Sequence, residues 1–168
     1  MSGSEKEQLL TTTIHIDSRD VYKSKSIDGL IKYKLKEKTE GFCGKHGYVV
    51  KGSVVVVKRS IGKAITHNNQ SKIEYNLTYK LKTILPCVEE KYTCIIDSIT
   101  KMGIIAYLKS TDDNLSNLTD SPILFIVPQG YVDDITLFSK DQKVEIEVIQ
   151  NRVKYQTKQI QVVGKITK

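Results

Sequence analysis

A strict alternation of side chains over residues 73–81 constrains the fold more than any other feature of the sequence. Ile73, Tyr75, Leu77, Tyr79 and Leu81 alternate with polar residues along this stretch. Successive side chains of a β-strand point to opposite faces, so a period of two predicts a strand with one buried and one solvated face.

Further strands and one helix are predicted on the N-terminal side of this strand. Residues 11–16 alternate and are β-branched, and residues 48–57 form a β-branched run in which Gly52 predicts a bend. Between these strands the sequence predicts a single helix over residues 21–37. It is indicated by apolar residues at helical spacing, namely Ile27, Leu30, Ile31 and Leu35.

The second half of the chain predicts five short strands separated by turns. Pro86 marks the boundary, because proline cannot donate a hydrogen bond to a β-ladder. The strands are predicted at residues 92–99, 104–108, 123–127, 144–148 and 160–166. Five short strands in such a segment fit an OB-type barrel, a fold that binds oligonucleotides, although another small β fold fits the pattern equally well.

We therefore expect an α+β, mostly β chain with two domains. Residues 1–82 would form an antiparallel sheet with one helix, and residues 83–168 an OB-type five-stranded barrel. Lysine and arginine number 26 against 19 acidic residues, so the net charge of +7 favours a polyanionic partner such as nucleic acid. A basic excess of this size is also common in ordinary soluble proteins, so charge alone decides little.

The sequence predicts no membrane partner and an intracellular protein. No apolar run approaches the roughly 20 residues that span a bilayer, and the first residues lack the apolar stretch of a secretory signal. The three cysteines, Cys43, Cys87 and Cys94, are an odd number without a CxxC pair, which indicates reduced thiols.

No catalytic constellation is predicted, and no cofactor. The chain has three histidines and neither a phosphate-binding glycine loop nor a nucleophile motif. Cys43 and His46 have the spacing of half a zinc site, but structural zinc sites usually bring two compact pairs, so we predict no metal. We expect a binding protein rather than an enzyme.

A family resemblance goes further than these patterns. The segment Glu40–Val49 reads Glu-Gly-Phe-Cys-Gly-Lys-His-Gly-Tyr-Val. It resembles the segment that joins helix to hairpin in the stalk subunit of archaeal and eukaryotic multisubunit RNA polymerases, which in eukaryotic polymerase II is the seventh-largest subunit. This chain is one residue shorter between its cysteine and the following glycine.

Shorter similarities follow in the same order and together cover roughly residues 12–167. They are Ile61-Gly62, Tyr79-Lys80, Pro86, Thr100–Ile104, Phe125–Val127, Arg152-Val153 and Val163-Gly164. No single motif is diagnostic, and the order and spacing carry the resemblance. The chain departs from the family at Glu89, where the family has glycine, and at Lys63-Ala64, where the family has a loop of glycines.

The resemblance implies a tip domain that docks on the polymerase core and a barrel that binds nascent RNA. The residues expected to contact the core are Gly41, Gly44, Lys45, His46, Gly47, Ile61 and Gly62. The residues expected to bind RNA, by phosphate charge and by base stacking, are Lys101, Tyr107, Lys109, Lys143 and Arg152. The residues alone leave simpler interpretations open, because glycines also serve ordinary β-turns and lysines also cover solvated strand faces.

The partners that follow are the large polymerase subunits, a small helical stalk subunit and single-stranded RNA. The location would be the nucleus for a cellular protein. It would be the host cytoplasm or the virion if the abundant lysine, isoleucine and asparagine reflect a large cytoplasmic DNA virus. Two alternatives remain: a freestanding OB-fold RNA binder in translation or RNA chaperoning, and an interaction module whose barrel never touches RNA.

Overall fold

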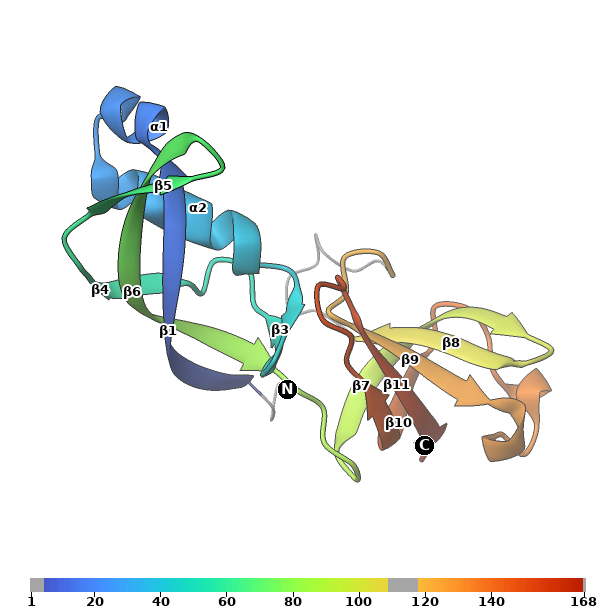
Figure 1. The fold of residues 1–168 in the computed structure, drawn as a ribbon. Helices are drawn as coiled ribbons and strands as arrows, with labels where there is room; N and C mark the ends of the chain where they lie inside the picture. The colour runs from blue at the N-terminus through green and yellow to red at the C-terminus, as the bar shows by residue number, and fades with distance from the viewer. Residues whose placement is uncertain (1–4, 109–117, 168) are drawn as a thin grey trace. The chain divides into compact units, whose positions relative to one another are not determined.

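The protein, seen in a computed structural model that describes residues 5–108 and 118–167, folds into two compact units (Figure 1). The first, which we call the sheet–helix unit, comprises residues 6–40 and 49–83. The second, the barrel unit, comprises residues 41–48, the described residues from 84 onward and Glu5. Neither unit matches a continuous segment, because the short stretch 41–48 groups with the barrel.

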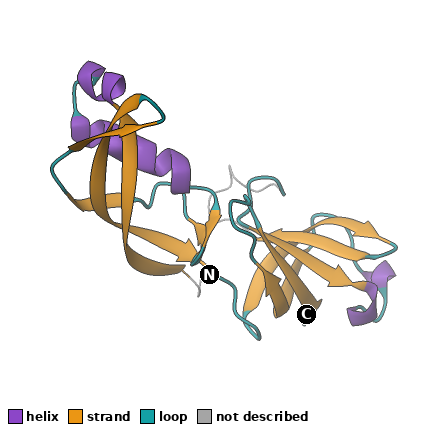
Figure 2. Ribbon diagram, in the orientation of Figure 1, coloured by secondary structure: helices purple, strands orange, loops and turns teal. Residues whose placement is uncertain are grey.

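Strands and two helices build the sheet–helix unit (Figure 2). They are β1 (Glu5–Asp17), α1 (Ser18–Lys23), α2 (Ile27–Thr39), β4 (Val55–Arg59), β5 (Lys63–His67) and β6 (Gln70–Ile84). β6 is the central strand: β1 pairs with one side of it, and β4 and β5 follow one another along the other side. Side-chain hydrogen bonds from Thr13 to Asn76 and between His15 and Glu74 show that β1 and β6 run antiparallel.

The alternation that predicted β6 is confirmed. Tyr75, Leu77, Tyr79 and Leu81 are all buried, and they pack with Ile14 and Ile16 of β1 and with Ile31 and Leu35 of α2 in one core. The opposite face of the strand carries polar side chains such as Asn76 and Thr78. The bend predicted at Gly52 is also present, because the β-branched run divides into β3 (Gly47–Val49) and β4 around that residue.

The single helix predicted over residues 21–37 is wrong, because two helices occupy this region. The amide of Ser24 bonds to the carbonyl oxygens of Asp20 and Val21, which ends α1. Ser26 then takes an extended conformation with φ −144°, and its hydroxyl accepts a hydrogen bond from the amide of Gly29, which begins α2. Serine is among the preferred N-cap residues, so this capping defines a new helix start.

The barrel unit contains a short hairpin and a closed barrel. The hairpin is β2 (Cys43–Gly44) with β3 (Gly47–Val49). The barrel strands are β7 (Lys91–Thr100), β8 (Gly103–Leu108), β9 (Ile123–Pro128), β10 (Lys143–Arg152) and β11 (Ile160–Ile166), with the 3₁₀ turns η2 (Gln129–Tyr131) and η3 (Ile135–Leu137) between β9 and β10. All five strands predicted for the second half are confirmed.

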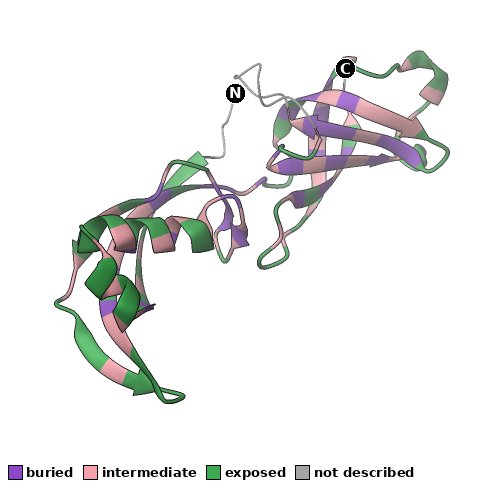
Figure 3. Cartoon of the chain, turned by 90° about the horizontal axis from the view of Figure 1, so that it is seen from above, coloured by how far each residue is buried: buried purple, intermediate pink, exposed green. Residues whose placement is uncertain are grey.

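The barrel closes in the order β10-β11-β9-β8-β7, with β7 returning to β10. β9 and β11 are parallel, pairing Ile123 with Ile160, whereas the other pairs are antiparallel. Figure 3 shows buried positions recurring along these strands. Phe125 is fully buried, and its ring lies 5.6 Å from that of Tyr92 between ring centres. None of the helices formed by the described residues is long and apolar enough to cross a membrane.

Candidate protein and nucleic-acid interfaces

The glycine-rich segment predicted to contact a polymerase core forms the β2–β3 hairpin. Cys43 pairs with Tyr48 and Gly44 with Gly47, which leaves Lys45 and His46 as the two turn residues. Gly47 has φ +109°, and a Cβ at this position would collide with the carbonyl oxygen of Ile84. Only glycine therefore fits at Gly47, whereas a Cβ at Gly44 would meet no atom within 4 Å.

This hairpin is bound to the connection between β10 and β11. The amide of Cys43 donates a 2.7 Å hydrogen bond to the carbonyl oxygen of Thr157, and the amide of Gln156 donates one of 2.9 Å to the carbonyl oxygen of Cys43. Burial raises the pKa of the Cys43 thiol, while the side chain of Thr157 acts in the opposite direction. Cys43 therefore makes internal contacts of the barrel unit, whereas Lys45, at the turn of the hairpin, is exposed.

The other two residues predicted for core contact, Ile61 and Gly62, lie between β4 and β5 in the sheet–helix unit. The side chain of Ile61 is 91% exposed, an unusual position for a large apolar residue. A Cβ at Gly62 would come within 2.7 Å of Cγ2 of Ile73, so glycine lets the loop lie close to β6. The predicted core contacts are thus divided between the two units.

The basic residues predicted to bind RNA are spread along the barrel rather than gathered. Lys101 lies in the turn after β7, and Lys143 is the first residue of β10. Because β7 and β10 are antiparallel, both residues lie toward the same end of the barrel. Arg152 ends β10, roughly 30 Å from Lys143 at about 3.4 Å per residue. All three side chains are exposed, and Lys109 falls outside the described residues.

The stacking role predicted for Tyr107 does not fit the structure. The residue is only 7% exposed, and a ring this buried offers no face on which a base can stack. Burial raises the pKa of its phenol, and the negative charges of Asp141 and Asp97 add to this effect. Tyr107 is part of the packing around β8.

A different set of residues combines an exposed aromatic ring with positive side chains, and the prediction from sequence missed it. Tyr155, in the connection between β10 and β11, is 75% exposed, and Lys154 and Lys158 flank it within that connection. A signal was present in the sequence: after Glu147 the chain contains five basic residues and no acidic residue.

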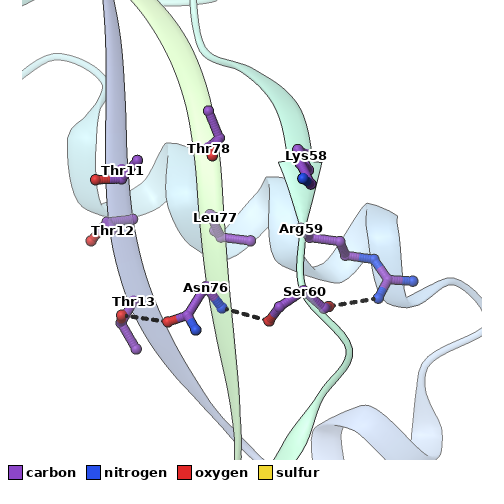
Figure 4. Close-up of a pocket in the computed structure, with 9 residues that line it drawn as sticks. All are labelled: Thr11, Thr12, Thr13, Lys58, Arg59, Ser60, Asn76, Leu77 and Thr78. Atoms are coloured by element: carbon purple, nitrogen blue, oxygen red, sulfur yellow. Dashed lines mark hydrogen bonds between the residues drawn. The ribbon is translucent and has the colours of Figure 1, made fainter.

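A hollow in the sheet–helix unit lies on the polar face of the sheet (Figure 4). It has a volume of about 510 Å³ and is lined by Thr11, Thr12, Thr13, Lys58, Arg59, Ser60, Asn76, Leu77 and Thr78. The side-chain oxygen of Asn76 accepts a 2.8 Å hydrogen bond from the hydroxyl of Thr13, and the backbone amide of Asn76 donates to the hydroxyl of Ser60. Arg59 is paired with Asp28 at 2.5 Å. This lining contains no histidine, cysteine or carboxylate, so it provides neither a general base nor a metal ligand set.

Cys43 and His46, the candidate zinc residues, gain no further ligands from the part of the chain that the structure describes. Among residues 5–108 and 118–167, no three histidine, cysteine or acidic side chains cluster as a metal site requires.

No model of a known protein family matches the chain, and no curated protein matches it in sequence.

Proposed function

We propose that the chain is a non-catalytic stalk subunit of a multisubunit DNA-directed RNA polymerase, which docks on the polymerase core and binds nascent RNA on its barrel. The sequence supports this through the order of short motifs from Glu40–Val49 to Val163-Gly164, which follows the order in that family. The large polymerase subunits, a small helical stalk subunit and single-stranded RNA are the proposed partners.

The closed barrel following a sheet–helix unit is the observation that carries the proposal. When the barrel strands are numbered in chain order from β7 to β11, the first strand pairs with the second and fourth, and the third pairs in parallel with the fifth. We interpret this five-stranded arrangement as an OB fold, in which the face of strands two and three and the loops after strands one and four bind oligonucleotides.

The backbone at Glu89 gives independent support. The family has glycine at this position, and Glu89 adopts φ +72°, a conformation that glycine reaches without strain and other residues rarely adopt. Its amide donates a 2.8 Å hydrogen bond to the carbonyl oxygen of Val148, and the amide of Val148 donates in return to Glu90. A positive φ at the position where the family has glycine supports the resemblance.

The exposed loop at Ile61 is the proposed docking contact of the sheet–helix unit. Burying an apolar side chain of this size on a partner removes it from water at a gain of about 1.5–3 kcal/mol. Lys45 and His46, at the turn of the β2–β3 hairpin, are the proposed contacts of the barrel unit, because Cys43 and Gly47 are occupied by internal packing.

Affinity purification from cells that make the protein naturally, followed by mass spectrometry, tests the docking. We expect the two largest polymerase subunits and a small helical subunit to be recovered with the wild-type chain. Ile61→Asp should release them without lowering the melting temperature. Leu137→Asp is the matched control, because Leu137 is also a highly exposed apolar residue, at 72%, but lies in η3. Equal recovery with both variants would contradict docking through Ile61.

One observation favours the alternative of a freestanding OB-fold RNA binder acting in translation or as an RNA chaperone. The segment that the resemblance assigns to core contact uses Cys43 to bind the barrel's own connection at Gln156 and Thr157. Recovery of RNA without polymerase subunits would support this alternative and would overturn the stalk assignment.

A further inference from the structure

We infer that single-stranded RNA is bound at the connection between β10 and β11, with phosphates on Arg152, Lys154 and Lys158 and a base stacked on Tyr155. This inference rests on the RNA-binding part of the proposed function and gives it a location. It moves the site away from Tyr107, and away from the end of the barrel that carries Lys101 and Lys143.

The three cations share one hollow. A depression of about 230 Å³, which we call the basic pocket, is lined by Arg152, Lys154, Thr157, Lys158, Gln159 and Gln161. The described part of its lining contains three positive side chains, polar groups and no carboxylate. A phosphodiester needs hydrogen-bond donors and positive charge, and this lining supplies both.

Within residues 5–108 and 118–167, no ion pair neutralises the charges of the basic pocket. None of the ion pairs between described residues includes Arg152, Lys154 or Lys158, whereas Lys91 and Lys165 on neighbouring strands pair with Glu145 and Glu147. Three cations lining one small hollow repel each other, and a bound polyanion would relieve this repulsion. The acidic residue of the adjoining 118–121 segment is Asp120, whose charge acts on the phenol of Tyr48.

Internal hydrogen bonds fix the connection, so the pocket is formed before any ligand arrives. The hydroxyl of Thr157 donates to the carbonyl oxygens of Lys154, at 2.7 Å, and of Gln159, at 3.2 Å. The side-chain amide of Gln159 donates to the carbonyl oxygens of Leu118 and of Ser121. A connection held in this way loses little further conformational entropy on binding.

The ring of Tyr155 completes the character of a single-strand site. It lies directly after Lys154 in the chain and is 75% exposed. Sites that bind single strands combine a basic groove with aromatic rings on which unstacked bases lie, and a duplex cannot use such a ring because its bases are already stacked. Single-stranded RNA is therefore favoured over duplex nucleic acid.

Titration of the full chain with a fluorescent uridine oligonucleotide at several salt concentrations tests the site. The combined variant Arg152→Gln, Lys154→Gln and Lys158→Gln should lower affinity and flatten the plot of log K against log salt by about two units, since each phosphate contact on a single strand contributes about 0.7. Tyr155→Ala should weaken binding about 5- to 150-fold with little change in that slope.

Matched controls lie away from the connection. Lys32→Gln with Lys38→Gln removes two exposed cations from α2, and Tyr131→Ala removes a ring that is 50% exposed in η2 of the barrel. Neither control should change affinity more than about twofold. Melting temperatures should match the wild type throughout, because the altered side chains are exposed and the hydrogen bonds of the connection come from Thr157, Gln159 and the backbone.

The outcomes separate the site from the function. Wild-type binding that the variants leave unchanged would overturn the site and leave RNA binding intact. No binding by the wild type would overturn the RNA-binding part of the proposed function. A third outcome is that inorganic polyphosphate displaces the oligonucleotide as well as unlabelled RNA does, while Tyr155→Ala leaves the affinity for RNA unchanged. That result would show a general polyanion surface and overturn the single-strand assignment. A matching deoxythymidine oligonucleotide shows whether the sugar is distinguished, and tighter binding of DNA than RNA would overturn the choice of RNA.

Discussion

The amide of Cys43 donates a 2.7 Å hydrogen bond to the carbonyl oxygen of Thr157, which joins the β2–β3 hairpin to the connection that lines the basic pocket. The thiol of the same residue is buried, and so is that of Cys94, whereas Cys87 is exposed. Thiol chemistry therefore reports directly on whether these contacts are formed.

A thiol reagent should modify one cysteine per chain in the native protein and all three after denaturation. Cys87 should react quickly, because it is exposed. Cys43 and Cys94 should react only as fast as the unit opens, since burial both blocks access and raises their pKa values. Counting released chromophore with and without denaturant measures this, and Cys87→Ser should abolish the fast phase. Rapid modification of two thiols in the native chain would contradict the burial of Cys43.

Gly47 and Gly44 should respond very differently to alanine. Gly47→Ala places a Cβ against the carbonyl oxygen of Ile84 at a backbone φ of +109°, so we expect a loss of about 2 kcal/mol or more in the free energy of unfolding. Gly44→Ala meets open space and should stay within about 0.5 kcal/mol of wild type. Urea unfolding of both variants gives the comparison, and equal losses would count against the hairpin geometry.

Glu89→Gly should stabilise the protein. Glu89 is held at φ +72°, and relief of about 1–2 kcal/mol of backbone strain exceeds the extra flexibility that glycine gives the unfolded chain. We expect a net gain of about 0.5–1 kcal/mol. Val88→Gly is the matched control, since Val88 is exposed without a positive φ and should lose stability. Thermal melts would decide the matter, and a fall in melting temperature for Glu89→Gly would be the contrary result.

Stability should decline in alkaline solution. The pKa values of Cys43, Cys94, Tyr48 and Tyr107 are all raised, chiefly by burial. Above the ordinary pKa of a thiol, about 8.5, and of a phenol, about 10, the unfolded chain releases protons that the folded chain retains. Unfolding is then favoured, by up to about 1.4 kcal/mol per pH unit for each such group.

Urea unfolding at pH 8, 9.5 and 11 should therefore show a steady loss of stability. Cys94→Val removes one buried thiol and should reduce the loss between pH 8 and 9.5. A free energy of unfolding that stays constant across this range would contradict the burial of these groups.

Local patterns predicted the strands well, because alternation is a property of neighbouring residues. For this reason the prediction of a strand from Ile73 to Leu81 was correct, and these residues lie within β6. The break between α1 and α2 was missed, since the prediction extended the helix of residues 27–35 back to Val21 across the polar residues 23–26, and the sequence alone does not reveal which serine caps a helix.

The candidate sites depended on contacts that local patterns do not contain. β8 reads Gly-Ile-Ile-Ala-Tyr-Leu, which is apolar at nearly every position, so no alternation indicated which face Tyr107 occupies. The pairing of Cys43 with Gln156 and Thr157 joins distant parts of the chain. The gathering of Arg152 with Lys158 in one pocket depends on how the connection folds back, which only the structure shows.

The parallel pairing of β9 with β11 has a consequence for how the barrel forms. β11 is the last strand in the chain order of the barrel, and it lies between β9 and β10, so both of these strands keep an open edge until residues 160–166 arrive. Open edges recruit strands from other molecules, and pairings between distant segments form slowly. Refolding should therefore have a late step, the insertion of β11, during which the chain self-associates at high concentration and after which it does not.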